Sequence, residues 1–144
     1  MALLNRSSGS GTRSMRATAR QRAKFQHDVT ARGHTVVVDE PEATGGDDAG
    51  PSPQELLAAA LASCTAVTME MYAQRKGWDV ADLVVDCRYT PAERGCPTRF
   101  ELVLKMPAHL DEEQVERLSA IAAKCPVHRT LEGEVAFDER VEIA

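Results

Sequence analysis

The strongest constraint on the fold is a long helix signal in the first half of the chain. Ser52 suits the N-cap position, Pro53 suits the first helical position, and Glu55 stands three residues after the cap, as in a capping box. Good helix formers then continue to Lys76, and the following Gly77 is a typical helix stop. The sequence therefore predicts one long helix between these two signals.

Segments typical of β-strands flank this helix on both sides. The alternation of Phe25, His27 and Val29 with polar neighbours and a β-branched run over 35–38 predict a hairpin before the helix. Residues 83–89 and 100–106, separated by a loop that contains Pro and Gly, predict a second hairpin after it. A last strand is expected near 141–143.

A second helix is expected to begin at Asp111, because Gln114 follows three residues later as in a capping box. Its apolar positions recur at helical spacing and are Val115, Leu118, Ile121, Ala122 and Cys125. The predicted element order is ββ-α-ββ-α-β. Because the hairpins pair neighbouring strands, the sheets should be mainly antiparallel, and the fold class is α+β.

Composition sets the domain count and excludes some partners. The small and polar residues 1–14 are expected to form a disordered tail, and residues 15–144 are expected to form a single domain with one core. A net charge of -5 and 4% aromatic residues do not favour nucleic-acid binding. We see no signal-peptide core and no run of about 18 apolar residues, so a cytoplasmic protein without a membrane partner is expected.

Two of the four cysteines lie on the apolar stripes of the predicted helices. At about 100° per residue, Leu61 lies within roughly 60° of the direction of Cys64, and Leu118 lies equally close to the direction of Cys125. If the helices pack together, the thiols can meet, although two buried core cysteines would give the same pattern. Pro126 cannot continue the helix before it, so Cys125 is expected to cap a new helix whose free amides favour a thiolate.

Cys87 and Cys96 are expected to have no chemical role. Cys87 alternates with Val85 on one face of a predicted strand, which is typical of a packing residue. Cys96 lies in the loop between Gly95 and Pro97 and is expected to be a bystander thiol.

Two stretches resemble the signatures of the OsmC/Ohr family, the osmotically inducible and organic hydroperoxide resistance proteins. The first covers 50–64 and reads Gly-Pro-Ser-Pro-Gln-Glu-Leu-Leu-Ala-Ala-Ala-Leu-Ala-Ser-Cys, and the second covers 124–131 and reads Lys-Cys-Pro-Val-His-Arg-Thr-Leu. The resemblance extends from Arg22 to the C-terminus, and over 60–78 it is greatest to the OsmC-like branch. It implies an intertwined homodimer in which two long central helices pack against the sheets.

The same resemblance implies a thiol-dependent peroxidase of oxidative stress defence. In the family, the cysteine matched by Cys64 reduces an organic hydroperoxide to the alcohol, and the one matched by Cys125 resolves the product as a disulfide. A dithiol or lipoyl-type reductant then restores the thiols. No cofactor and no metal are expected, because the sulfur atoms carry the redox chemistry themselves.

The acidic residue of the family site has only an approximate match. Family members carry a glutamate directly after the proline at the helix start, where this chain has Gln54. Glu55 matches the neighbouring position and is the candidate. It lies about 180° around the helix from Cys64 and some 13 Å along it, so it could approach a site only from elsewhere in the dimer.

The arginine that stabilises the reactive thiolate in the family also lacks a clear match. The loop 39–53, which precedes the helix, contains no arginine. Arg20, Arg22 and Arg32 are the early candidates, and Arg22 is the one we select.

Two other functions remain open. The presence of Gln54 favours a protein of the same fold that binds a small molecule, or that senses peroxide with weak or no turnover. A zinc-like site formed by Cys64, Cys125 and His128 is the second alternative.

Overall fold

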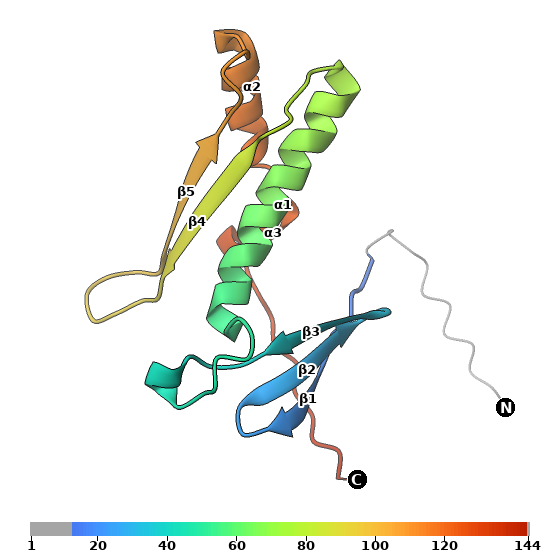
Figure 1. The fold of residues 1–144 in the computed structure, drawn as a ribbon, viewed down its shortest axis with the longest axis vertical. Coiled ribbons are helices and arrows are strands. Elements are labelled where there is room, and N and C mark those ends of the chain that lie inside the picture. Colours follow the sequence, from blue (N-terminus) through green and yellow to red (C-terminus); the bar gives the residue numbers. More distant parts are fainter. Residues whose placement is uncertain (1–12, 144) are drawn as a thin grey trace, which may run out of the picture. The chain divides into compact units, whose positions relative to one another are not determined.

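The computed structural model describes residues 13–143 of the chain, drawn in Figure 1. These residues fall into two compact units, one ending at Pro53 and one beginning at Gln54. The segment 1–14, expected as a disordered tail, lies outside the described residues except for its last two positions.

The first unit is a three-stranded antiparallel sheet. Its strands are β1 (Thr18–Ala23), β2 (Gln26–Ala31) and β3 (His34–Val38), in that spatial order. The predicted hairpin corresponds to β2 and β3 and is confirmed. The strand β1 was not predicted, because its six residues are all exposed and show no alternation of apolar side chains.

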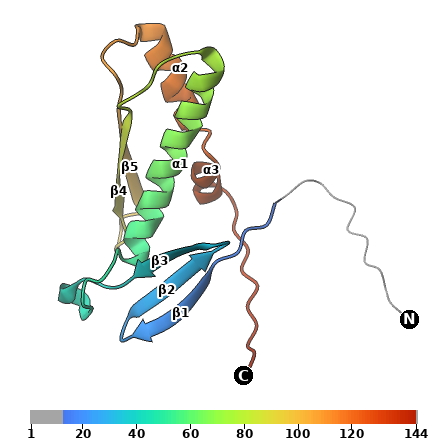
Figure 2. The same ribbon diagram turned by 45° about the vertical axis from the view of Figure 1, so that its right-hand side comes forward.

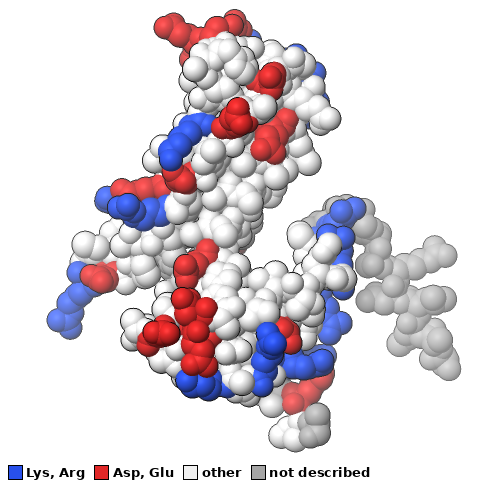
Figure 3. Space-filling model, in the orientation of Figure 1, with Lys and Arg blue, Asp and Glu red and all other residues white. Residues whose placement is uncertain are grey.

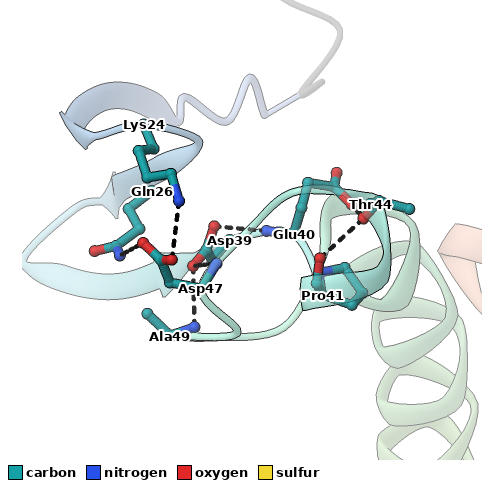
Figure 4. A network of polar contacts seen from close by, with 8 residues as sticks. All are labelled: Lys24, Gln26, Asp39, Glu40, Pro41, Thr44, Asp47 and Ala49. Atoms are coloured by element: carbon teal, nitrogen blue, oxygen red, sulfur yellow. Dashed lines mark hydrogen bonds and ion pairs between the residues drawn. The ribbon is translucent and has the colours of Figure 1, made fainter.

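The loop between β3 and the long helix is held by a buried carboxylate. The Asp39 side chain accepts hydrogen bonds from the backbone N–H groups of Glu40 (2.7 Å), Asp47 (3.1 Å) and Ala49 (3.0 Å), as Figure 4 shows. The bond from Ala49 is the largest influence on the pKa of Asp39. Burial opposes it, but the other two bonds and the charge of Lys24 act with it, and the pKa lies below its usual value. The Asp39 side chain therefore anchors this loop, which includes a short 3-10 turn, η1 (Glu42–Thr44).

We expect Asp39→Asn to lower the thermal midpoint of unfolding at pH 7 by several degrees, because an amide cannot accept all three N–H groups. The lowered pKa means that the carboxylate stabilises the fold above about pH 4 and loses this effect as the pH falls through the folded-state pKa. The difference from wild type in circular dichroism melts should therefore narrow as the pH is lowered step by step below about 4. Glu42→Gln, at an exposed position of the same loop, is the control and should melt like wild type at each pH.

The second unit combines a long helix with a hairpin and two shorter helices. Its elements are α1 (Pro53–Lys76), β4 (Val84–Thr90), β5 (Arg99–Lys105), α2 (Glu112–Ala122) and α3 (Pro126–Glu132). Figures 1 and 2 show α1 running alongside both the β4–β5 hairpin and α2. The two strands pair antiparallel, and Tyr89 stacks on Phe100 across them with 4.9 Å between ring centroids.

The core of this unit lies where α1 meets α2. Met69 and Ala73 of α1 and Leu118 and Ala122 of α2 are buried together, and partly buried side chains of the hairpin pack against them. Among the described residues, α1 is the one helix long and apolar enough to cross a membrane by length and composition. Its buried face against α2 and the hairpin makes it the central helix of this unit.

Most predicted boundaries agree with the structure. The long helix spans the predicted residues, and Gly77 follows it with φ of +71°. The second helix starts with the predicted capping box, in which Asp111 and Gln114 each accept the other's backbone N–H at 2.8 and 3.0 Å. Cys125 caps α3, as expected. The α+β class with antiparallel sheets is confirmed.

The predicted last strand is wrong. Residues 133–143 form neither helix nor strand in the structure. A strand exists only where its backbone pairs with a neighbour, and apolar alternation alone does not supply one. The observed order is therefore βββ-α-ββ-α-α rather than ββ-α-ββ-α-β.

Charged side chains are mixed over the surface. On the face that Figure 3 shows, acidic residues lie beside basic ones in both units. This distribution agrees with the net charge of -5.

Candidate active site

The structure brings Cys64 and Cys125 together. Cys64 lies in the middle of α1, and Cys125 is the residue that caps α3. The two side chains hydrogen-bond one another, and both are free thiols. Cys125 is completely buried, whereas Cys64 is only half-buried. The pair is thus a dithiol of which one sulfur is more accessible than the other.

The start of α3 directs backbone amides at this dithiol. Cys125 has extended backbone angles (φ -61°, ψ 139°), and its sulfur accepts the N–H of His128 at 3.3 Å. Burial opposes ionisation of Cys125. The hydrogen bond from the His128 amide acts most strongly against burial. The Val127 amide and the side chains of Cys64 and Thr65 act in the same direction, and together these groups lower the pKa of the Cys125 thiol.

The pKa of the Cys64 thiol is shifted in the opposite direction. Burial raises the pKa of the Cys64 thiol, and its interaction with Cys125 raises it further. The amide of Val127 and the side chain of Thr68 act in the other direction without cancelling these effects. Each of the two thiols is thus among the influences on the pKa of the other.

A cavity of about 280 Å³ lies next to residues that neighbour the dithiol, although neither cysteine is part of its wall. Leu61, one helical turn before Cys64, and His128, whose amide binds Cys125, both contribute to its wall. The rest of the wall includes Phe100, Leu102, Leu131 and Glu132. The ring of His128 is turned to the Glu132 carboxylate, with Nε2 at 2.7 Å from Oε1. The cavity wall is therefore largely apolar, with a polar edge formed by His128 and Glu132.

Glu55 lies at the start of α1, and Arg22 lies on β1. Glu55 is in the first turn of α1, nine residues before Cys64 (64 minus 55), which corresponds to about 13 Å of helix rise. Arg22 is on β1, in the other compact unit, and forms an ion pair with Asp28 at 3.7 Å.

Two contributions to the site were missed from the sequence. The Thr65 hydroxyl and the Val127 amide both act on the sulfurs. The position of Thr65 next to Cys64 is the one signal in the sequence that could have suggested its role. The zinc alternative gains no support, because the described residues contain no group of three His, Cys, Asp or Glu side chains placed to hold a metal ion.

The remaining two cysteines are separate from the dithiol. Cys87 pairs with Leu102 across the β4–β5 hairpin, and burial raises the pKa of its thiol. Cys96 is exposed in the hairpin loop, where its backbone pairs with Glu93. Both observations agree with structural rather than chemical roles.

Antiparallel hairpins, a long central helix and a hydrogen-bonded dithiol at the start of α3 define an α+β protein with a candidate thiol redox site. Residues 45–140 match the family model described as OsmC-like protein, and the chain belongs to this family.

Solved structures agree with this assignment at the level of the fold. The chain is similar to an OsmC-like protein from Mycoplasma pneumoniae, with a TM-score of 0.71, 19% identity, and coverage of 84% of this chain and 89% of that one. It is also similar to the organic hydroperoxide resistance protein OhrB of Bacillus subtilis, with a TM-score of 0.57, 21% identity, and coverage of 83% and 91%. An organic hydroperoxide resistance protein from Elizabethkingia anophelis gives a TM-score of 0.64 at 18% identity, with coverage of 87% and 92%. No curated protein matches the chain.

Proposed function

We propose that this chain is a thiol-dependent peroxidase that reduces organic hydroperoxides to alcohols. The observation that carries the proposal is the direct contact between the side chains of Cys64 and Cys125 near a largely apolar cavity. Two thiols in hydrogen-bond contact can pass from thiol to sulfenic acid to disulfide without a large backbone movement.

The proposed reaction has two steps in the protein. The Cys64 thiolate attacks the terminal oxygen of the hydroperoxide, an S–O bond forms, the O–O bond breaks, and the alkoxide leaves as the alcohol after taking up a proton. Cys64 is now a sulfenic acid. The Cys125 thiolate attacks its sulfur, the disulfide forms, and hydroxide leaves and becomes water. An external dithiol, of the lipoyl type or similar, then reduces the disulfide.

The cavity supports an organic rather than an inorganic peroxide as substrate. Its wall is built mainly from leucine and phenylalanine side chains, and its volume of about 280 Å³ leaves space for an alkyl or aryl group. Two of the similar structures are organic hydroperoxide resistance proteins by name. Glu55 and Arg22 stay candidates for supporting roles at this site.

The assay that tests this function follows cumene hydroperoxide consumption by the reduced protein with dihydrolipoamide as reductant. We expect repeated turnover, faster than with hydrogen peroxide, and a Cys64–Cys125 disulfide in the product when the reductant is omitted. Absence of both peroxide consumption and peroxide-dependent modification of Cys64 would contradict the proposal.

A second candidate function is small-molecule binding or peroxide sensing with little turnover. The raised pKa of the Cys64 thiol and the presence of Gln54 favour it, since both reduce the reactivity of Cys64. In this case one equivalent of peroxide should oxidise Cys64 slowly, and dihydrolipoamide should not support repeated turnover.

We further propose that the working protein is a homodimer. The helix α1 leaves Val67 and Met71 exposed on its outer side, with exposed fractions of 44% and 60%. The segment after α3 exposes four apolar side chains at alternating or nearly alternating positions, namely Val135, Phe137, Val141 and Ile143. A second copy of the chain could cover these surfaces.

Light scattering of the wild type should therefore give about twice the chain mass of 15.7 kDa. We expect Phe137→Asp to raise the dissociation constant of the dimer by about tenfold or more, because it places a charge in an apolar contact. Asp138→Asn, at the next position, is the control and should leave the constant unchanged. A wild type that stays at the mass of one chain at high concentration would exclude the dimer.

A further inference from the structure

The strands of the first unit carry a high density of positive charge. Leaving histidine aside, residues 13–38 contain six Lys and Arg side chains and a single acidic one, Asp28, so this segment has a net charge of +5. The whole chain has a net charge of -5, so the rest of it has a net charge of -10 (-5 minus +5). The charge of the protein is therefore strongly divided along the sequence.

Two of these six cations have acidic partners. Lys24 Nζ lies 3.0 Å from Asp47 Oδ1, and Arg22 Nε lies 3.7 Å from Asp28 Oδ1. No ion pair with a described residue is formed by the other four, namely Arg13, Arg16, Arg20 and Arg32. A guanidinium group offers five N–H donors and stays charged throughout the physiological pH range, so neighbouring arginines without acidic partners favour an anion.

Three of these arginines surround one hollow of about 980 Å³, which lies within the first unit where β1 begins and β2 ends. The polar part of its wall consists of three guanidinium groups and three hydroxyl groups, from Arg13, Arg16, Arg32, Ser14, Thr18 and Thr30. The remaining two wall residues are apolar, and none is acidic. Thr18 and Thr30 are paired across the two strands, so their side chains lie on the same face of the sheet. This wall is therefore suited to a negatively charged ligand.

Arg32 stands in the wall in spite of its backbone conformation. It is the first residue of the two-residue turn between β2 and β3, and its φ is +58°. This left-handed region is disfavoured for long side chains, and glycine or asparagine is usual there. Lys24 also has a positive φ, +49°, but its side chain is paired with Asp47. An anion in the hollow would give Arg32 the partner that Lys24 already has.

The three guanidinium groups are best matched by a ligand with more than one negative charge. A carboxylate carries one charge, and a single arginine can pair with it through two parallel N–H bonds. A phosphate group carries about -1.5 to -2 charges at pH 7 and presents three acceptor oxygens, which guanidinium groups match in geometry. The hydroxyl groups of Ser14, Thr18 and Thr30 add donors for these oxygens. The donor set thus favours phosphate over carboxylate.

The charge of the rest of the chain limits the size of the ligand. With a net charge of -10 outside 13–38, the protein repels extended anionic surfaces such as nucleic acid or a membrane. A small anion can reach the hollow and meet only the local positive charge. The charge distribution therefore favours a soluble phosphate compound over a polyanion.

We propose that this hollow binds the phosphate group of a small soluble molecule through Arg13, Arg16 and Arg32. The site lies entirely within the first unit and contains neither cysteine of the dithiol, so the proposal does not depend on the proposed peroxidase function. All of its polar side chains are exposed, so salt should screen the interaction and weaken binding.

The test is a titration of the full chain, labelled with ¹⁵N, with pyrophosphate as the probe, followed by NMR at low ionic strength. We expect saturable shifts of the amide signals around the hollow, at Arg16, Thr18, Thr30 and Arg32, with a dissociation constant below about 1 mM. Sodium chloride at matched ionic strength should not reproduce these shifts. Shifts that rise linearly without saturation, or that sodium chloride reproduces, would overturn the proposal.

Arg32→Asn tests the role of the turn. It removes one guanidinium group and introduces a residue that tolerates the positive φ, so the fold should persist while the dissociation constant rises about tenfold. Lys24→Asn is the matched control, because it also removes one cation at a positive φ but lies outside the wall. It should change the constant by less than about twofold. Equal losses of affinity in the two variants would show a response to net charge rather than to this hollow, and would refute the proposal.

A lipid headgroup presents the same phosphate chemistry, so a second arm of the experiment uses sedimentation of phosphatidylcholine vesicles that contain phosphatidic acid. We expect the protein to stay in the supernatant, because most of the chain is acidic. Co-sedimentation would overturn the assignment to a soluble ligand. None of these measurements uses peroxide, so their failure is distinguishable from failure of the peroxidase assay.

Discussion

Replacing Cys64 with serine is expected to lower the rate of organic hydroperoxide consumption by about 10³-fold or more. The reaction needs a thiolate as nucleophile, and a serine hydroxyl is neither ionised near neutral pH nor able to form a sulfenic acid. Consumption of cumene hydroperoxide in the presence of dihydrolipoamide measures the effect.

Two further variants separate the roles of the cysteines. Cys125→Ser should still react once with peroxide, but Cys64 should then accumulate as a sulfenic acid, which a dimedone adduct detects by mass. Cys87→Ser removes a half-buried thiol outside the dithiol and should keep the wild-type rate. Retention of activity in Cys64→Ser, or an equal loss in Cys87→Ser, would show that the reactive thiol has been assigned wrongly.

Local signals account for the helix boundaries that could be predicted. The end of α1 at Gly77 and the start of α2 at Asp111 depend on capping groups within a few residues in sequence. The strand β1 and the final segment depend instead on pairing with a neighbour. An exposed strand with no apolar pattern was therefore missed, and an apolar pattern without a partner strand was read as a strand.

The residues of the candidate site also differ in whether they could be predicted from the sequence. The predicted positions of Cys64 and Cys125 on apolar stripes, together with the family resemblance, were enough to select these two residues, although α2 ends at Ala122, before Cys125. The Val127 amide, which acts on both sulfurs, could not be selected, because it meets Cys64 only when α1 and α3 come together.

The second large effect is expected for Leu118→Ala in the core between α1 and α2. Leu118 is completely buried against Met69 and Ala73, and its truncation leaves a cavity that the surrounding helices can fill only in part. The expected loss is about 2–5 kcal/mol of the free energy of unfolding. Urea unfolding followed by the fluorescence of Trp78, the single tryptophan, measures it, because this side chain packs against the same core.

Val115→Ala, on the same helix but 37% exposed, is the matched control and should cost much less than Leu118→Ala. The core variant also bears on the site. A hydrogen bond from the Cys125 N–H to the Ala122 carbonyl (3.4 Å) links the end of α2 to Cys125. Loosening α2 should therefore also slow disulfide formation between Cys64 and Cys125. Equal losses of stability in the two variants would mean that the α1–α2 contact is not the core of this unit.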